Sequence, residues 1–284
     1  MTHHGSQVNI ERRIPILLWR LAQWPYWWWF LAFTLLSATL FVGKNQLIDL
    51  YEDIALFRAP SAARAADFGE RHLDARSNPA LYDIDRAEYM YREAAKLDPT
   101  YPYVNHQLAR IAFLKGNFGT AMYFINKEIM LHGDTNKNAY YVRGLIEGYK
   151  GDYDAAVEDY AHFLTTNNSW ATMNDYAWVL LKAERYTEAE DITAEGLERF
   201  PDNPWLLNSH ATALFELGEY TGALAAAKKA AVMVEKVTKA EWSRYYPGND
   251  PRIAGEGIAS FKSAIADNIH TIERALASST VQPK

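Results

Sequence analysis

Side chains that could carry acid–base, nucleophilic or metal chemistry are spread through this chain without the spacing that such chemistry requires. The eight histidines offer no pair placed to bind one ion from a single helix face, and the adjacent pair lies near the terminus. They are His3, His4, His72, His106, His132, His162, His210 and His270. Phosphate-binding glycine loops, zinc-binding histidine motifs and serine-nucleophile motifs are all missing. The sequence therefore predicts no catalytic residue, no metal site, no cofactor and no enzyme activity.

Carboxylates lead to the same expectation. The acidic run between Glu184 and Asp191 has the spacing of a solvated helix face. Asn249 and Asp250 follow Gly248, but the series of oxygen ligands that a calcium loop needs is absent. We interpret this stretch as a turn.

Composition narrows the class of protein further. The chain has 284 residues, a net charge of −6 and no cysteine. A nucleic-acid surface would need clustered basic residues, so no nucleic-acid partner is expected. Without cysteine there can be no disulfide and no thiolate metal site, which suits an extracytoplasmic domain without establishing one.

The elements that must position any functional side chain are set by a repeated alanine. It recurs at intervals of 34, 35, 33 and 34 residues. The positions are Ala87, Ala121, Ala156, Ala189 and Ala223. A fixed period of this length is typical of paired helices stacked into a solenoid with a long concave surface.

The surroundings of each alanine repeat as well. An apolar residue lies three positions earlier, at Ile84, Phe118, Tyr153, Tyr186 and Tyr220. A small residue lies twelve positions earlier, at Ala75, Ala109, Gly144, Ala177 and Ala211. Glycines before three of the rings, namely Gly116, Gly151 and Gly218, predict the tight turn between two helices, and Glu184 takes that place in a fourth repeat. Small residues at both places would let the two helices of a pair approach closely.

These motifs resemble the tetratricopeptide repeat (TPR) family. Ala87 is followed by Tyr91 and then by Pro99, and Ala156 is followed by Tyr160, as in the family signature. Other repeats depart from it, with Ile125, Thr193 and Ala227 at the ring position and Gly133, Asn168 and Glu235 in place of proline. The resemblance implies an all-α, right-handed α-solenoid of TPR helix-turn-helix repeats over 61–237. Four clear repeats are expected at 102–135, 137–170, 170–203 and 204–237, after one degenerate repeat.

The N-terminal part predicts a membrane anchor. Residues 24–43 contain no charged side chain, and their length matches the about 20 residues needed to cross a bilayer. Tryptophans cluster at one end of this run, as they do at membrane interfaces. We weighed a buried core helix and a cleaved signal peptide, and favour an uncleaved signal anchor that forms a single N-terminal transmembrane helix.

Flanking charges then give an orientation. Arg12, Arg13 and Arg20 precede the run, whereas only Lys44 and Arg58 follow it closely. The positive-inside rule predicts that segment 1–23 is cytoplasmic or interfacial. The TPR domain would be extracytoplasmic, periplasmic or extracellular, on what we expect to be a bacterial plasma membrane.

Three further segments complete the predicted organisation. Residues 44–60 have the apolar spacing of a juxtamembrane helix, followed by a hinge at Ala59, Pro60 and Ser61. Residues 238–257 are rich in turn residues and predict a loop. An apolar stripe over 258–278 predicts a C-terminal helix that caps the solenoid, with docking of a partner as the alternative.

The TPR resemblance also implies where a partner would bind. Its contact positions are the second, fifth, ninth and twelfth residues of each repeat, in the helix that lines the groove. Carried onto this chain, the binding candidates are Tyr103, His106, Arg110, Phe113, Asn138, Tyr141, Asn174, Trp178, Trp205, Asn208, Thr212 and Phe215. Amides and rings suit an extended peptide or a partner helix, although each ring could instead pack between helices. Arg110 is the only basic residue among them, so the family's carboxylate clamp is not expected.

The sequence thus predicts a membrane-anchored TPR scaffold or adaptor that mediates protein–protein interaction or complex assembly at the membrane surface. The alternative is a non-catalytic subunit of an envelope-assembly complex for secretion, cytochrome maturation or cell-wall synthesis. Both hypotheses rest on resemblance of fold together with the predicted anchor.

Overall fold

The structure is a computed structural model that describes residues 28–31, 33, 34, 43–74, 79–246 and 248–281. It divides into two compact units, Met1–Arg58 and Ala59–Lys284. The first unit contains helix α3 (Lys44–Arg58), in the stretch where a helix and hinge were expected. All further helices named below belong to the second unit.

The predicted membrane span lies mostly outside the described residues. Of the run 24–43, the structure describes only 28–31, 33, 34 and 43. Crossing a bilayer requires one continuous apolar helix of about 20 residues, and no helix in the described part of the chain combines that length with that apolar character. This finding contradicts the predicted single-pass localisation with its cytoplasmic N-terminus. The prediction rested on the absence of charge, the length of the run and the tryptophans at one end.

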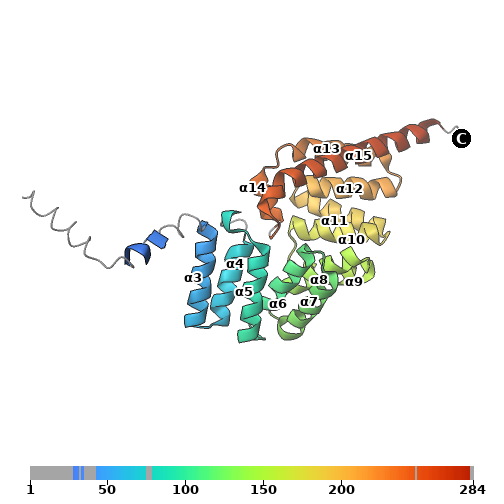
Figure 1. The fold of residues 1–284 in the computed structure, drawn as a ribbon. Coiled ribbons are helices and arrows are strands. Elements are labelled where there is room, and N and C mark those ends of the chain that lie inside the picture. Colours follow the sequence, from blue (N-terminus) through green and yellow to red (C-terminus); the bar gives the residue numbers. More distant parts are fainter. Residues whose placement is uncertain (1–27, 32, 35–42, 75–78, 247, 282–284) are drawn as a thin grey trace, which may run out of the picture. The chain divides into compact units, whose positions relative to one another are not determined.

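The second unit is a solenoid of helix pairs, which confirms the predicted all-α fold (Figure 1). The pairs are α4 (Ala62–Leu73) with α5 (Ile84–Leu97), α6 (Val104–Leu114) with α7 (Phe118–His132), α8 (Asn138–Lys150) with α9 (Tyr153–Leu164), α10 (Trp170–Lys182) with α11 (Tyr186–Arg199), and α12 (Pro204–Glu216) with α13 (Tyr220–Val234). Ser61 caps α4 by accepting a hydrogen bond from the Arg64 amide, so the first pair begins at the expected hinge.

The repeated alanines lie inside these pairs. Ala87, Ala121, Ala156, Ala189 and Ala223 are all fully buried. In the α8–α9 pair, a Cβ added to Gly144 would lie 3.3 Å from the Ala156 carbonyl oxygen, so the two backbones meet closely. Small side chains at both places are what permits this approach.

The turns within the pairs use a left-handed residue. Gly116, Gly151 and Gly218 have φ of 73°, 88° and 81°. Glu184 takes the same place with φ of 59°, a conformation that costs a residue with a Cβ more than it costs glycine. The sequence-based turn assignment therefore holds even where glycine is missing.

The C-terminal part differs from the loop expected at 238–257. It forms helix α14 (Lys239–Tyr245), a short 3₁₀ turn η3 (Pro251–Ile253) and the long helix α15 (Ala254–Val281). Thr238 and Glu241 form a reciprocal capping box that starts α14, a local signal that outweighs the nearby turn residues. Ile265 and Ile272 of α15 are buried against α12 and α13, as Figure 1 shows for the helices. Helix α15 thereby covers the last pair, α12 and α13.

Candidate binding cavity on the inner face

The first helices of four successive pairs lie on the inner side of the solenoid. Successive first helices α6, α8, α10 and α12 contact one another directly. In a curved array of helix pairs, the helices that contact their counterparts in the next pair lie on the concave side. This side is the one predicted to carry the partner-binding residues.

A cavity of about 480 Å³ lies on this side. Seven predicted groove residues line it, namely Arg110, Phe113, Tyr141, Asn174, Trp178, Trp205 and Asn208. Pockets of this size, walled by rings with a few polar groups, are typical of ligand sites. The structure thus brings together predicted residues from four different helices.

The other five predicted residues lie elsewhere. Tyr103 caps α6 with φ of 65°, Asn138 is exposed, and Thr212 donates to the Asn208 carbonyl of its own helix. His106 is buried, and Phe215 packs with Tyr220 of α13, with ring centroids 5.6 Å apart. His106 and Phe215 therefore pack between helices, which was the alternative to a place in the cavity wall.

His106 belongs to a buried polar cluster between α6 and α7. Its backbone N–H donates to the Glu128 carboxylate at 3.3 Å, and its Nδ1 lies 3.4 Å from the Asn136 side-chain amide. Loss of hydration on burial, with a smaller effect of Arg110, lowers the pKa of His106 to about 3. The imidazole is therefore neutral and structural at physiological pH.

Four cavity residues from the C-terminal part were missed by the sequence reasoning. Tyr245, Tyr246, Asn249 and Phe261 all line the cavity. The indole N–H of Trp205 donates to the Tyr246 hydroxyl at 2.9 Å, and burial raises the pKa of that hydroxyl to about 12. Several rings close together in a supposed loop were the available signal, because exposed loops seldom carry so many.

The C-terminal part is tied to the first repeats as well. The Tyr82 hydroxyl, before α5, donates to the Gly248 carbonyl at 2.6 Å. Gly248 has φ of 92°, and a Cβ there would lie 2.9 Å from Nη2 of Arg110. The two bonded residues are 166 positions apart in sequence and meet beside the cavity.

Trp205 is the centre of the aromatic wall. Its ring stacks on Phe261 at 5.3 Å and on Trp170 at 5.0 Å between centroids. Trp170 in turn meets Tyr245 edge-to-face at 4.7 Å. Stacked and edge-to-face rings at these separations stabilise one another beyond simple burial.

The polar floor of the cavity comes from α10 and α12. Ser209 donates to the Asn174 side-chain oxygen at 2.9 Å, and Asn268 of α15 donates to Asn208 at 2.9 Å. Asp175 was not predicted, although it follows a predicted position directly. Its Oδ2 accepts from the Tyr141 hydroxyl at 2.5 Å, and burial raises the pKa of the carboxyl above its usual range.

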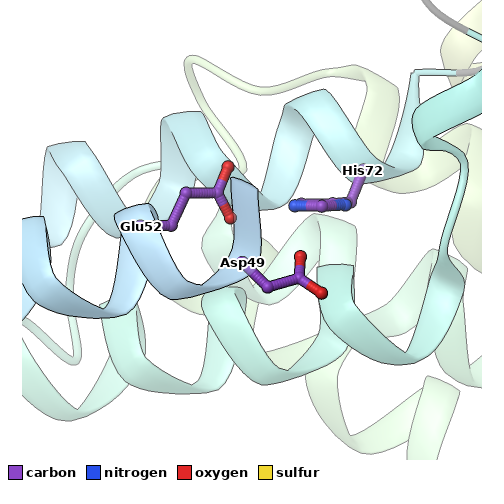
Figure 2. A group of neighbouring side chains, drawn as sticks. All are labelled: Asp49, Glu52 and His72. Carbon is purple, nitrogen blue, oxygen red and sulfur yellow. The ribbon is translucent and has the colours of Figure 1, made fainter. Parts of the chain in front are cut away.

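Two carboxylates of α3 and one imidazole of α4 are of the types that bind metals (Figure 2). Asp49 and Glu52 are three residues apart on α3, and His72 lies at the end of α4, where its Nδ1 is 3.2 Å from the Leu81 carbonyl. Helices α3 and α4 belong to different units, so we assign no shared site to these residues.

Comparison with known proteins agrees with this architecture. A tetratricopeptide repeat family model matches residues 141–204 and 177–236, which reach from α8 into the start of the segment after α13. No curated protein matches the chain. The matched repeats support the tetratricopeptide repeat family, whose members are in general non-catalytic scaffolds.

Solved structures of TPR proteins share the fold. A tetratricopeptide repeat protein from Parabacteroides merdae is 18% identical, with a TM-score of 0.56, and the match covers 84% of this chain and 96% of that one. YrrB, described as a TPR protein with an unusual peptide-binding site, is 16% identical with a TM-score of 0.53, covering 65% and 93%. The MamA protein is 20% identical with a TM-score of 0.52, covering 62% and 92%. At these identities the likeness concerns the fold.

Proposed function

We propose that this protein is a TPR scaffold that binds a segment of a partner protein in the cavity on its inner face. The observation that carries the proposal is the cavity of about 480 Å³, whose walls combine rings and amides from the first helices of four successive repeats. Such a combination suits a peptide, because rings bury its side chains and amides pair with its backbone.

Two observations support a peptide as the occupant. TPR repeats bind protein or peptide partners, and the similar YrrB is described as having a peptide-binding site. The cavity of this chain is also bounded by the C-terminal part through Tyr245 and Tyr246, which adds walls that a plain groove lacks. A short segment would fit this shape better than a long helix laid along an open groove.

A matched pair of tyrosine variants tests the proposal in the full chain. Tyr149 lines the cavity from the first helix α8 and is 57% exposed, whereas Tyr123 lies on the second helix α7 and is 64% exposed. Tyr149 also packs with Phe113 and Trp178, with ring centroids 5.1 and 5.2 Å apart, and Tyr123 packs with Phe124 at 5.2 Å. Thermal unfolding of Tyr149→Ala and Tyr123→Ala therefore checks that both variants stay folded.

The measurement is binding of each variant to an immobilised library of random peptides. We expect the parent and Tyr123→Ala to select the same peptides, and Tyr149→Ala to lose most of them. Equal selection by both variants, or no selection by the parent, would contradict peptide binding in the cavity.

A further inference from the structure

The cavity contains one carboxylate whose charge has no cationic partner. Asp175 lines the cavity from α10. Its Oδ2 accepts from the Tyr141 hydroxyl at 2.5 Å and its Oδ1 accepts from the Asn174 amide at 3.3 Å. Both of these partners are neutral, and no ion pair to Asp175 is found in the part of the chain that the structure describes. The negative charge is therefore hydrogen-bonded but not neutralised.

Burial makes this charge unfavourable in the empty cavity. Loss of hydration raises the pKa of Asp175, and the hydrogen bonds from Tyr141 and Asn174 offset only part of that effect. A cation placed beside the carboxylate would replace the missing hydration and stabilise the ionised form. The cavity is thus electrostatically suited to a positive ligand group at its α10 end.

Aromatic rings surround the same end. Tyr141 donates its hydroxyl to Asp175, and Tyr149 and Tyr246 line the same cavity. Asp175 also raises the pKa of these three hydroxyls, although burial is the larger cause for each. Tyr149 also packs with Trp178, with ring centroids 5.2 Å apart. The faces of such rings attract cations, and their edges bury alkyl chains.

Arg110 does not neutralise this end of the cavity. Its Nη1 donates to Gln107 at 2.8 Å, and its Nη2 lies close to Gly248. Arg110 lowers the pKa of Tyr141, but its effect is smaller than the opposite effect of Asp175.

We propose that the cavity binds the ammonium group of a lysine side chain on an extended peptide, with Asp175 as its counter-ion and the rings of Tyr149, Trp178 and Tyr246 around its alkyl chain. This inference rests on the proposed function and names the chemistry that the partner must carry. A lysine suits the geometry better than an arginine. Each oxygen of Asp175 already accepts one hydrogen bond, so a guanidinium fork would need the remaining lone pairs of both oxygens side by side, whereas an ammonium needs only one of them.

Two isosteric variants test the counter-ion. Asp175→Asn removes the charge and keeps an oxygen that can accept from Tyr141. Asp191→Asn makes the same change in net charge on the exposed surface of α11 and serves as the control. Thermal unfolding of both variants checks that the fold is intact.

The probes are acetylated and amidated pentapeptides with a central lysine and varied flanks, the same set with norleucine in place of lysine, and butylammonium alone. Affinities for the full chain are measured by ligand-observed NMR titration. We expect the parent and Asp191→Asn to bind lysine peptides at least about tenfold more tightly than norleucine peptides, and Asp175→Asn to lose that preference.

The possible outcomes separate the two proposals. Equal binding of lysine and norleucine peptides would overturn the lysine inference and leave peptide binding standing. Binding of butylammonium without any peptide, lost in Asp175→Asn, would support a cation site but overturn the proposed peptide function. If none of the probes binds, both are wrong.

Discussion

In the repeats, the first helices α6, α8, α10 and α12 each end beside a residue in the left-handed conformation, whereas α14 and η3 after them are held by contacts between distant residues. The repeat turns contain left-handed residues such as Gly151 and Gly218 at fixed places. The later segment depends on rings, because Trp242 packs on α15 at Gly257, where an added Cβ would lie 2.5 Å from the indole. Local conformation thus shapes the turns of the repeats, and contacts between distant residues shape the segment after them.

This difference matters for the cavity. The repeats supply its floor from the first helices, with Asn174 and Asp175 among the lining residues. The C-terminal part supplies the remaining wall through Tyr245, Tyr246 and Phe261. A regular repeat array gives a groove, and the added segment turns it into a cavity.

The largest effect is expected from Ala156→Glu, which places a carboxylate between α8 and α9. Ala156 is fully buried against the Gly144 region, so the charge would have no partner and no room. We expect a loss of about 5 kcal/mol or more and unfolding of part of the array. Circular dichroism during urea unfolding measures it. Ala155→Glu, at an exposed position of the same helix, is the control, and equal stability of the two variants would show that the helix register is wrong.

Trp205→Ala should instead loosen the C-terminal segment. The variant removes stacking on Phe261 and Trp170 and the hydrogen bond to Tyr246. A buried Trp→Ala change costs about 3–5 kcal/mol, and we expect the loss to fall mainly on α14. Hydrogen exchange should show faster exchange in 239–246 and little change in α8 and α9. Uniform loss of protection in all repeats would mean that the two regions unfold together.

Acid should destabilise the repeats through His106. Its pKa is lowered from 6.5 to about 3, so the folded protein binds fewer protons than the unfolded chain between these values. Stability is therefore complete above about pH 6.5 and falls as the pH drops towards 3, by about 2 kcal/mol at pH 5. Urea unfolding at pH 7 and pH 5 measures this loss. His106→Gln should show a smaller pH dependence, and an unchanged dependence would assign the effect to other groups.

The smallest effects are expected at the turns. Gly151→Ala puts a Cβ on a residue with φ of 88° and no neighbour within 4 Å, so the cost is conformational, about 1 kcal/mol. Glu184→Gly makes the reverse change and should be neutral or stabilising by about 0.5 kcal/mol. Thermal unfolding compares the two. Opposite signs would support the shared turn geometry, and the same sign would contradict it.

Much of the fold could be predicted because its signals are local and periodic. The buried alanines and the left-handed turns each follow from residues within one repeat. The site could be predicted only in part. Asn174 and Trp178 line the cavity as expected, but Phe215 packs against α13, and Asp175 was passed over although it lies next to a predicted position. The register of a helix predicts the face on which a side chain lies. The neighbouring side chains decide whether it lines the cavity or packs between helices.

The N-terminal run teaches a related lesson. Its lack of charge satisfied the composition rule for a membrane span, yet none of the helices in the described ranges could cross a bilayer.

The stacking of helix pairs follows from the sequence, because small residues and turn residues recur at a fixed spacing and act over a few positions. The cavity on the inner face, with Asp175 in its lining, follows from the tertiary structure. That arrangement depends on the hydrogen bonds from Tyr82 to Gly248 and from Trp205 to Tyr246. It also depends on the rings from several helices that line the same cavity as the half-buried Asp175. Contacts between residues so far apart produce no periodic pattern in the sequence.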